Sequence, residues 1–141
     1  MPVRKARASW GPSGKVGGGE IRSESGALSA AYSFGSRFEN EPGTNPEELL
    51  GAAHAACFNM ALALALTDAG HPPAKLETAA EVSIEKVDKA FRITSVHLVT
   101  AAEVPGISEQ DFQEQAHKTK LSCPVSKALS GTDIFLEAKL V

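Results

Sequence analysis

The hydrophobic pattern of the chain is dominated by one nearly continuous apolar segment, residues 49–67. The signals before it predict a helix start, because Asn45 is a suitable N-cap and Pro46 a suitable first helical residue. Glu48 occupies the acidic position of a capping box. Gly70 is suited to the left-handed conformation after the last helical turn. A helix of about 24 residues is roughly 36 Å long at 1.5 Å per residue.

This segment is close in length and apolar character to a membrane span. Three features instead favour the buried centre of a soluble fold. His54 and Asn59 interrupt the apolar run, alanine outnumbers leucine, and acidic residues flank both ends without a basic anchor. One small domain does not easily cover so long an apolar helix. We therefore expect a second copy of the chain to bury part of it.

The segments on either side of this helix predict strands and two shorter helices. A half-buried strand is expected at 5–10, and glycine-punctuated strands follow the turn-like stretch 11–19 up to residue 38. Residues 82–93 have the pattern of a hairpin centred on 88–90. A helix is expected to start at Ser108, with Phe112, Ala116 and Thr119 on its inner face. A short helix at 124–130 and a final strand at 134–140 complete the pattern. Because sheet and helices segregate along the chain, the expected class is α+β.

Length and charge narrow the range of functions. The 141 residues suit a single domain, residues 1–141. The net charge of −3 gives no electrostatic reason to expect nucleic acid or an acidic membrane surface as a partner. No apolar region follows the positively charged N-terminal residues, so no secretory signal is recognised. Two cysteines in such a chain indicate a reducing compartment, and we expect the cytoplasm.

The two cysteines are the candidate reactive groups. Cys57 lies within the long apolar helix, where a single cysteine usually packs as a small hydrophobic residue. Cys123 directly precedes Pro124 at the expected start of a helix, where free backbone N–H groups favour a thiolate. The alternative is that Cys123 serves only as a cap. Together, one buried thiol and one thiol at a helix start fit an attacking and a resolving cysteine, which indicates redox chemistry.

Three further residues are candidates for the same site. His54, three residues before Cys57, lies on the same helical face. It could form a Cys–His pair, ligate a metal, or, as we favour, bond to a buried carbonyl or hydroxyl. Arg37 precedes the long helix at the end of a strand, and Glu47 lies in the first turn of that helix. An arginine held by this carboxylate would stabilise a thiolate, whereas the alternative is a surface salt bridge worth about 0–1 kcal/mol.

At these residues the chain resembles the OsmC/Ohr peroxide-reductase family, and within it the OsmC (osmotically inducible protein C) branch. The motifs that carry the resemblance are GTNPEELLGAAHAACF at 43–58, CPVSKAL at 123–129, ESG at 24–26 and RFE at 37–39. The resemblance covers nearly the whole chain. Asn59 stands where the family pattern has serine, a change that leaves the thiol chemistry untouched.

The resemblance implies a fold and a reaction. The fold would be an intertwined homodimer with the long helices buried between antiparallel sheets. Cys57 would attack an organic hydroperoxide, or hydrogen peroxide less efficiently, and Cys123 would resolve the sulfenic acid as a disulfide. Arg37 and Glu47 would hold the reactive thiolate. An external dithiol, of lipoyl type in some relatives, would restore the thiols, and no metal, haem or flavin cofactor is implied.

A preference for organic substrates implies an apolar pocket beside Cys57, for which Phe58, Met60 and Phe38 are candidates. Two other classes of protein stay open at this point. A hydrolase would use Cys57 and His54 on activated esters. A non-catalytic protein would bind an apolar ligand at the dimer interface. The second cysteine weighs against both, because neither needs it.

Overall fold

The computed structural model describes residues 1–12 and 14–141. Ser13, within the glycine-rich stretch that the sequence predicts as a turn, lies outside the described residues. The chain forms two compact units, Met1–Leu49 and Leu50–Val141. The long helix α2, Pro46–Asp68, begins in the first unit and continues through the second. Its observed bounds agree with the predicted helix.

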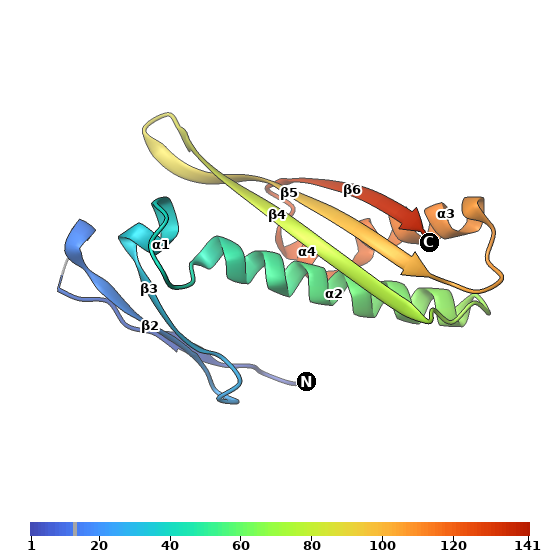
Figure 1. Ribbon diagram of the computed structural model, residues 1–141, viewed down its shortest axis with the longest axis horizontal. Coiled ribbons are helices and arrows are strands. Elements are labelled where there is room, and N and C mark those ends of the chain that lie inside the picture. Colours follow the sequence, from blue (N-terminus) through green and yellow to red (C-terminus); the bar gives the residue numbers. More distant parts are fainter. Residues whose placement is uncertain (13) are drawn as a thin grey trace. The chain divides into compact units, whose positions relative to one another are not determined.

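The first unit is a small antiparallel sheet followed by a short helix (Figure 1). Its strands, in the order β1-β2-β3, are Ala6–Ala8, Gly18–Ser23 and Ser29–Ser33. A 3-10 turn, η1, occupies Gly14–Val16, and helix α1 spans Phe34–Phe38. The prediction of a half-buried first strand is wrong, since all three residues of β1 are exposed. The alternation of apolar and polar residues in β1 therefore does not report burial.

The second unit is built on a second three-stranded sheet, in the order β4-β5-β6. Strands β4, Lys75–Val87, and β5, Ala90–Glu103, form the predicted hairpin. Asp88 and Lys89 both have positive φ, 50° and 71°, which suits a tight two-residue turn. Helices α3, Glu109–Ser122, and α4, Pro124–Ala128, then return the chain to the start of the sheet. Strand β6, Asp133–Leu140, therefore pairs with β5 in parallel.

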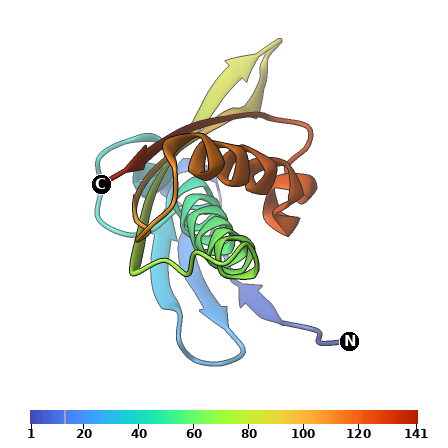
Figure 2. The same ribbon diagram turned by 90° about the vertical axis from the view of Figure 1, so that its right-hand side faces the viewer.

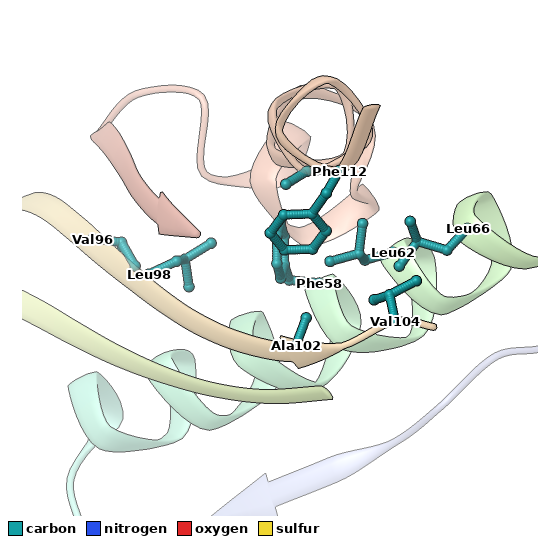
Figure 3. Packing of buried hydrophobic residues seen from close by; sticks show 9 residues of the cluster. Phe58, Leu62, Leu66, Val96, Leu98, Ala102, Val104 and Phe112 are labelled. Atoms are coloured by element: carbon teal, nitrogen blue, oxygen red, sulfur yellow. The ribbon is translucent and has the colours of Figure 1, made fainter. Parts of the chain in front are cut away.

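The core of the second unit lies between this sheet and the helices on one of its faces. Figure 2 shows α2 and α3 on the same side of the sheet. In Figure 3 their side chains meet those of β5. The buried apolar residues of this core are Phe58, Leu62, Leu66, Val96, Leu98, Ala102, Val104, Phe112 and Ala116. The predicted inner face of α3 is confirmed, because Phe112, Ala116 and Thr119 are all buried. The α+β class is likewise confirmed.

A polar network ties α2 to the inner face of the sheet. The Thr78 hydroxyl donates to Asn59 Oδ1 at 2.5 Å and shares a hydrogen bond of 2.7 Å with the Thr100 hydroxyl. Thr78 and Thr100 are paired across β4 and β5, so both point toward the helix. Asn59 is thus a satisfied contact between helix and sheet, and it fixes the position of α2 along the strands.

Helix α2 has a second, exposed apolar face. By length and composition it is the one described helix that would suffice to cross a membrane, a property shared by core helices of soluble proteins. Phe58 and Leu62 are fully buried, whereas Met60 is 69% and Leu64 62% exposed. With Ala56, these two exposed residues form a stripe at helical spacing, here called the α2 stripe. A single copy of the chain leaves this stripe uncovered.

Candidate functional site

The second unit brings the two cysteines together. Cys57 lies on α2 and Cys123 is the N-cap residue of α4, as the sequence predicts. Their sulfurs are 3.0 Å apart and share a hydrogen bond, although the residues are 66 positions apart in the chain. Both are free thiols, and Cys57 is partly exposed whereas Cys123 is fully buried. Peroxide in solvent can therefore reach the sulfur of Cys57 more readily than that of Cys123.

Burial and the start of α4 act in opposite directions on the protonation of this thiol pair. Burial raises the pKa of the Cys57 thiol, and its hydrogen bond with Cys123 raises it further, against one opposing contact from the Val125 N–H. Burial also disfavours the Cys123 thiolate, but hydrogen bonds outweigh it and lower the pKa of Cys123. They come from the Cys57 thiol, from the N–H and hydroxyl of Ser126, and from the Val125 N–H. Although Cys123 makes no side-chain capping bond, these groups stabilise a thiolate on its sulfur.

His54 lies on the same helix face as Cys57 and contacts α4. Its Nε2 atom is 2.7 Å from the Ser126 hydroxyl, and both residues are buried. This confirms the expectation that His54 is a buried histidine bonded to a hydroxyl. Burial lowers the pKa of His54, so the imidazole is neutral near pH 7. Because Nε2 faces Ser126, the Cys–His pair required by a hydrolase is not what this histidine forms.

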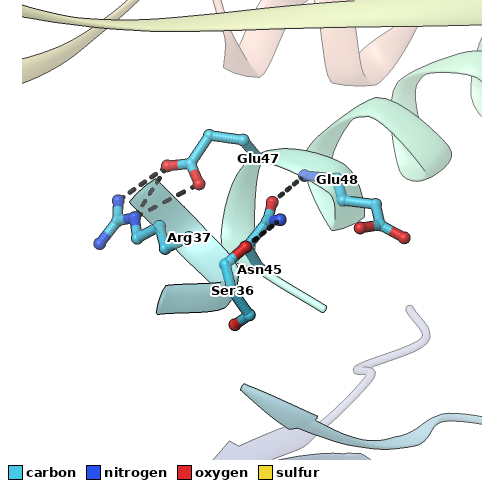
Figure 4. Close-up of polar contacts among 5 residues, drawn as sticks. All are labelled: Ser36, Arg37, Asn45, Glu47 and Glu48. Atoms are coloured by element: carbon cyan, nitrogen blue, oxygen red, sulfur yellow. Dashed lines mark hydrogen bonds and ion pairs between the residues drawn. The ribbon is translucent and has the colours of Figure 1, made fainter. Parts of the chain in front are cut away.

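In the first unit, Arg37 and Glu47 form a two-point ion pair (Figure 4). Arg37 Nη2 donates to Glu47 Oε1 at 2.8 Å, and Arg37 Nε donates to the same oxygen at 3.1 Å. The Glu47 side chain is only 8% exposed, whereas that of Arg37 is 36% exposed. A buried carboxylate with a forked arginine partner is more than a surface salt bridge. The pair uses Nε and Nη2, which leaves Nη1 for another acceptor.

The local sequence explains how this pair is held. Arg37 lies in helix α1, so the expectation that it stands at the end of a strand is wrong. The helix forms here because Ser33 and Ser36 make a reciprocal capping box at its start. Asn45 accepts a 2.7 Å bond from the Glu48 backbone N–H, and its amide donates to the Ser36 carbonyl at 3.0 Å. Glu48 contributes only its backbone to this cap, and its side chain points away from Asn45 (Figure 4).

Of the three pocket candidates, Phe38 lines a cavity in the described structure. This cavity, of about 230 Å³, lies in the first unit beside Arg37 and is also lined by Trp10, Tyr32, Ser33, Phe34 and Pro46. The Arg37 guanidinium lies 5.1 Å from the centre of the Phe38 ring. Phe58 is fully buried in the core of the second unit.

Sequence reasoning missed Ser126. The signal was available, since Ser126 is the third residue of α4, the position that pairs with the N-cap residue in a capping box. Nothing in the sequence predicts that a residue 72 positions away, His54, meets it. Among residues 1–12 and 14–141, no group of three or more His, Cys, Asp or Glu side chains is placed to hold a metal ion.

Known proteins share both the sequence and the fold. The family model described as "OsmC-like protein" matches residues 38–138. The chain is 47% identical over 138 residues to "Peroxiredoxin OsmC" of Escherichia coli (strain K12), covering 97% of this chain and 96% of that protein. It is 35% identical over 98 residues to "Organic hydroperoxide resistance protein OhrA" of Bacillus subtilis (strain 168), covering 69% and 68%. The solved structure of OhrB of Bacillus subtilis matches with a TM-score of 0.77 and 30% identity, covering 97% of this chain and 98% of that one. The chain therefore belongs to the OsmC family.

Proposed function

We propose that this protein is a thiol-dependent peroxidase that reduces organic hydroperoxides to alcohols, and hydrogen peroxide less efficiently. The observation that carries the proposal is the contact of two free thiols, 3.0 Å apart, of which one is partly open to solvent. Relatives named as a peroxiredoxin and as organic hydroperoxide resistance proteins support the same activity.

The proposed cycle uses both cysteines. The Cys57 thiolate attacks the terminal oxygen of the hydroperoxide, the O–O bond breaks, and the alkoxide leaves with a proton as the alcohol. Cys57 is then a sulfenic acid. The Cys123 thiolate attacks its sulfur, the S–O bond breaks, and water leaves as the disulfide forms. An external dithiol, for which the family resemblance implies a lipoyl-type group, reduces the disulfide and is itself oxidised.

Arg37 and Glu47 are proposed to support the first step. Within the second unit, burial raises the pKa of Cys57, so attack at neutral pH needs a further positive charge near its sulfur. Arg37 is the proposed source, with Glu47 fixing the orientation of its guanidinium. Nη1 is the nitrogen of this guanidinium that the pair with Glu47 leaves unused.

We further propose that the active form is a homodimer. The α2 stripe is apolar and exposed in one copy, and a second copy is the partner that a symmetric interface would supply. The family match crosses the boundary between the two units, which supports one OsmC-like domain over residues 1–141. Two free thiols fit a cytoplasmic protein. The acidic net charge does not favour nucleic acid or an acidic membrane as a partner.

Steady-state peroxide consumption with a dithiol reductant tests this function. Cys57→Ser is expected to abolish turnover. Cys123→Ser is expected to consume one equivalent of hydroperoxide and then stall, because the sulfenic acid has no resolving thiol. Full turnover by Cys57→Ser would remove this residue as the nucleophile. Absence of peroxide consumption by the folded, reduced native protein would favour the apolar-ligand binding alternative.

A further inference from the structure

A continuous line of buried polar groups connects α2 to the resolving cysteine. It starts at His54, whose Nε2 atom lies 2.7 Å from the Ser126 hydroxyl. Ser126 is the third residue of α4, the helix that Cys123 caps, and its hydroxyl favours the Cys123 thiolate. The Cys123 sulfur in turn lies 3.0 Å from the sulfur of Cys57. His54 and Cys123 are fully buried and Ser126 is 4% exposed. The line therefore starts and ends on α2, three residues apart, and passes through the start of α4.

The direction of the hydrogen bonds along this line depends on the charge of Cys123. A serine hydroxyl has one hydrogen to donate. When Cys123 is a thiolate, that hydrogen points to its sulfur, and the serine oxygen accepts from His54 Nε2–H. A neutral imidazole with its hydrogen on Nε2 has a bare Nδ1. His54 Nδ1 is buried, and among the described residues it has no hydrogen-bond partner. That arrangement matches the tautomer that the thiolate requires.

Packing alone does not account for this histidine. Leaving a ring nitrogen buried and unpaired costs free energy that a leucine or methionine at position 54 would avoid. Among residues 1–12 and 14–141, the polar partner of the ring is Ser126. The contact of Nε2 with the Ser126 hydroxyl, and not the volume of the ring, therefore explains why a histidine with an unpaired Nδ1 stands here.

We propose that His54 and Ser126 are positioning residues, which together hold a hydroxyl hydrogen against the Cys123 sulfur and so raise its thiolate fraction and make it a better leaving group. The inference rests on the proposed peroxidase cycle and deepens it. His54 orients the hydroxyl and does not itself gain or lose a proton. Neither residue contacts the peroxide in this account.

His54 and Ser126 act in the two steps that form and break the disulfide. In resolution, the Cys123 thiolate forms the S–S bond while the S–O bond of the Cys57 sulfenic acid breaks, and the departing oxygen takes a proton to leave as water. In reduction, the external dithiol attacks the Cys57 sulfur, the S–S bond breaks, and Cys123 departs as a thiolate. A thiol of lower pKa leaves faster, so the Ser126 hydroxyl assists this step as well.

The pH dependence of disulfide formation reports on this arrangement. The titratable groups that face Cys123 are Cys57 directly and His54 through Ser126, both from α2. From α4, the N–H groups of Val125 and Ser126 and the Ser126 hydroxyl act on the Cys123 sulfur. Once peroxide has converted Cys57 to the sulfenic acid, Cys123 is the thiol that attacks it. The inflection in a plot of the rate of disulfide formation against pH is therefore assigned to deprotonation of Cys123.

The experiment is a single turnover with one equivalent of an organic hydroperoxide, quenched at intervals and followed by intact mass between about pH 5 and pH 9. Ser126→Ala removes one buried oxygen and is the main variant. His54→Gln places an amide donor near the position of Nε2, whereas His54→Asn places it near Nδ1, out of reach of Ser126. Thermal melts of each variant establish that it is folded.

The proposal expects Ser126→Ala and His54→Asn to move the inflection upward by about one pH unit, a tenfold change in proton concentration. His54→Gln is expected to restore the native inflection. An unmoved inflection in Ser126→Ala overturns the proposal, even if the rate falls equally at every pH, because a merely structural role would do that. If the native protein forms no disulfide at any pH, it is the proposed function that fails.

Discussion

Leu64 offers a direct test of whether the α2 stripe is a dimer interface. Leu62 and Leu64 lie on the same helix, but Leu62 is fully buried in the core and Leu64 is 62% exposed. If a second copy covers the stripe, Leu64→Ala weakens association. It should affect the folding of a single chain much less than Leu62→Ala does.

The expected magnitude follows from the exposed fraction. Full burial of a leucine side chain is worth about 1.5–3 kcal/mol. Since 62% of Leu64 is available for burial and alanine retains one methyl group, the loss is about 1–1.5 kcal/mol per protomer. Both protomers of a symmetric dimer carry the change, which gives about 2–3 kcal/mol. The dissociation constant of the dimer should therefore rise about 30- to 150-fold.

Sedimentation equilibrium over a range of protein concentrations measures this constant. Phe135→Ala is the matched control, because Phe135 is 49% exposed but lies on the face of the sheet opposite α2. It should leave the dissociation constant unchanged. A native protein that stays monomeric at all concentrations would refute the dimer. An effect of Phe135→Ala equal to that of Leu64→Ala would refute the assignment of the interface to α2.

Three further predictions concern stability. Phe112→Ala is expected to lower the free energy of unfolding by about 3–5 kcal/mol in urea titrations, because the ring is fully buried in the core; a loss below 1 kcal/mol would contradict that packing. Since burial lowers the pKa of His54, the unfolded chain takes up a proton below pH 6.5 that the folded protein does not, so stability should fall as pH drops below 6.5. His54→Gln should flatten that fall, and an identical pH dependence would count against a neutral buried imidazole. Asn45→Ala should cost about 1 kcal/mol through loss of the α2 cap, whereas Asn45→Asp, which keeps the acceptor for the Glu48 N–H, should cost less; equal losses would argue against this role of the cap.

Sequence reasoning predicted those parts of the fold that local signals determine. The bounds of α2 followed from Asn45, Pro46 and Gly70, and the last of these has the expected positive φ of 88°. The hairpin and the inner face of α3 followed from periodicity. Alternation failed at β1, because a pattern of apolar and polar residues cannot reveal whether another element covers it.

The candidate site also has a part that the sequence predicts and a part that only the structure shows. Cys57 and Cys123 could be selected because a thiol suits one chemical role, and the structure brings their sulfurs together. The contact between His54 and Ser126 could not be predicted, because it arises where α4 meets α2, with the β4–β5 hairpin between them in the chain. Such distant meetings depend on packing, which no local pattern encodes.

The proposed peroxidase cycle depends most on the reaction between the two thiols. The measurement that tests it is the mass of the fully reduced protein, intact and as peptides, after one equivalent of an organic hydroperoxide in the absence of reductant. The cycle predicts the loss of two hydrogens and a peptide in which Cys57 is linked to Cys123 of the same chain. Two unmodified thiols in a folded protein, with the hydroperoxide unconsumed, would contradict it.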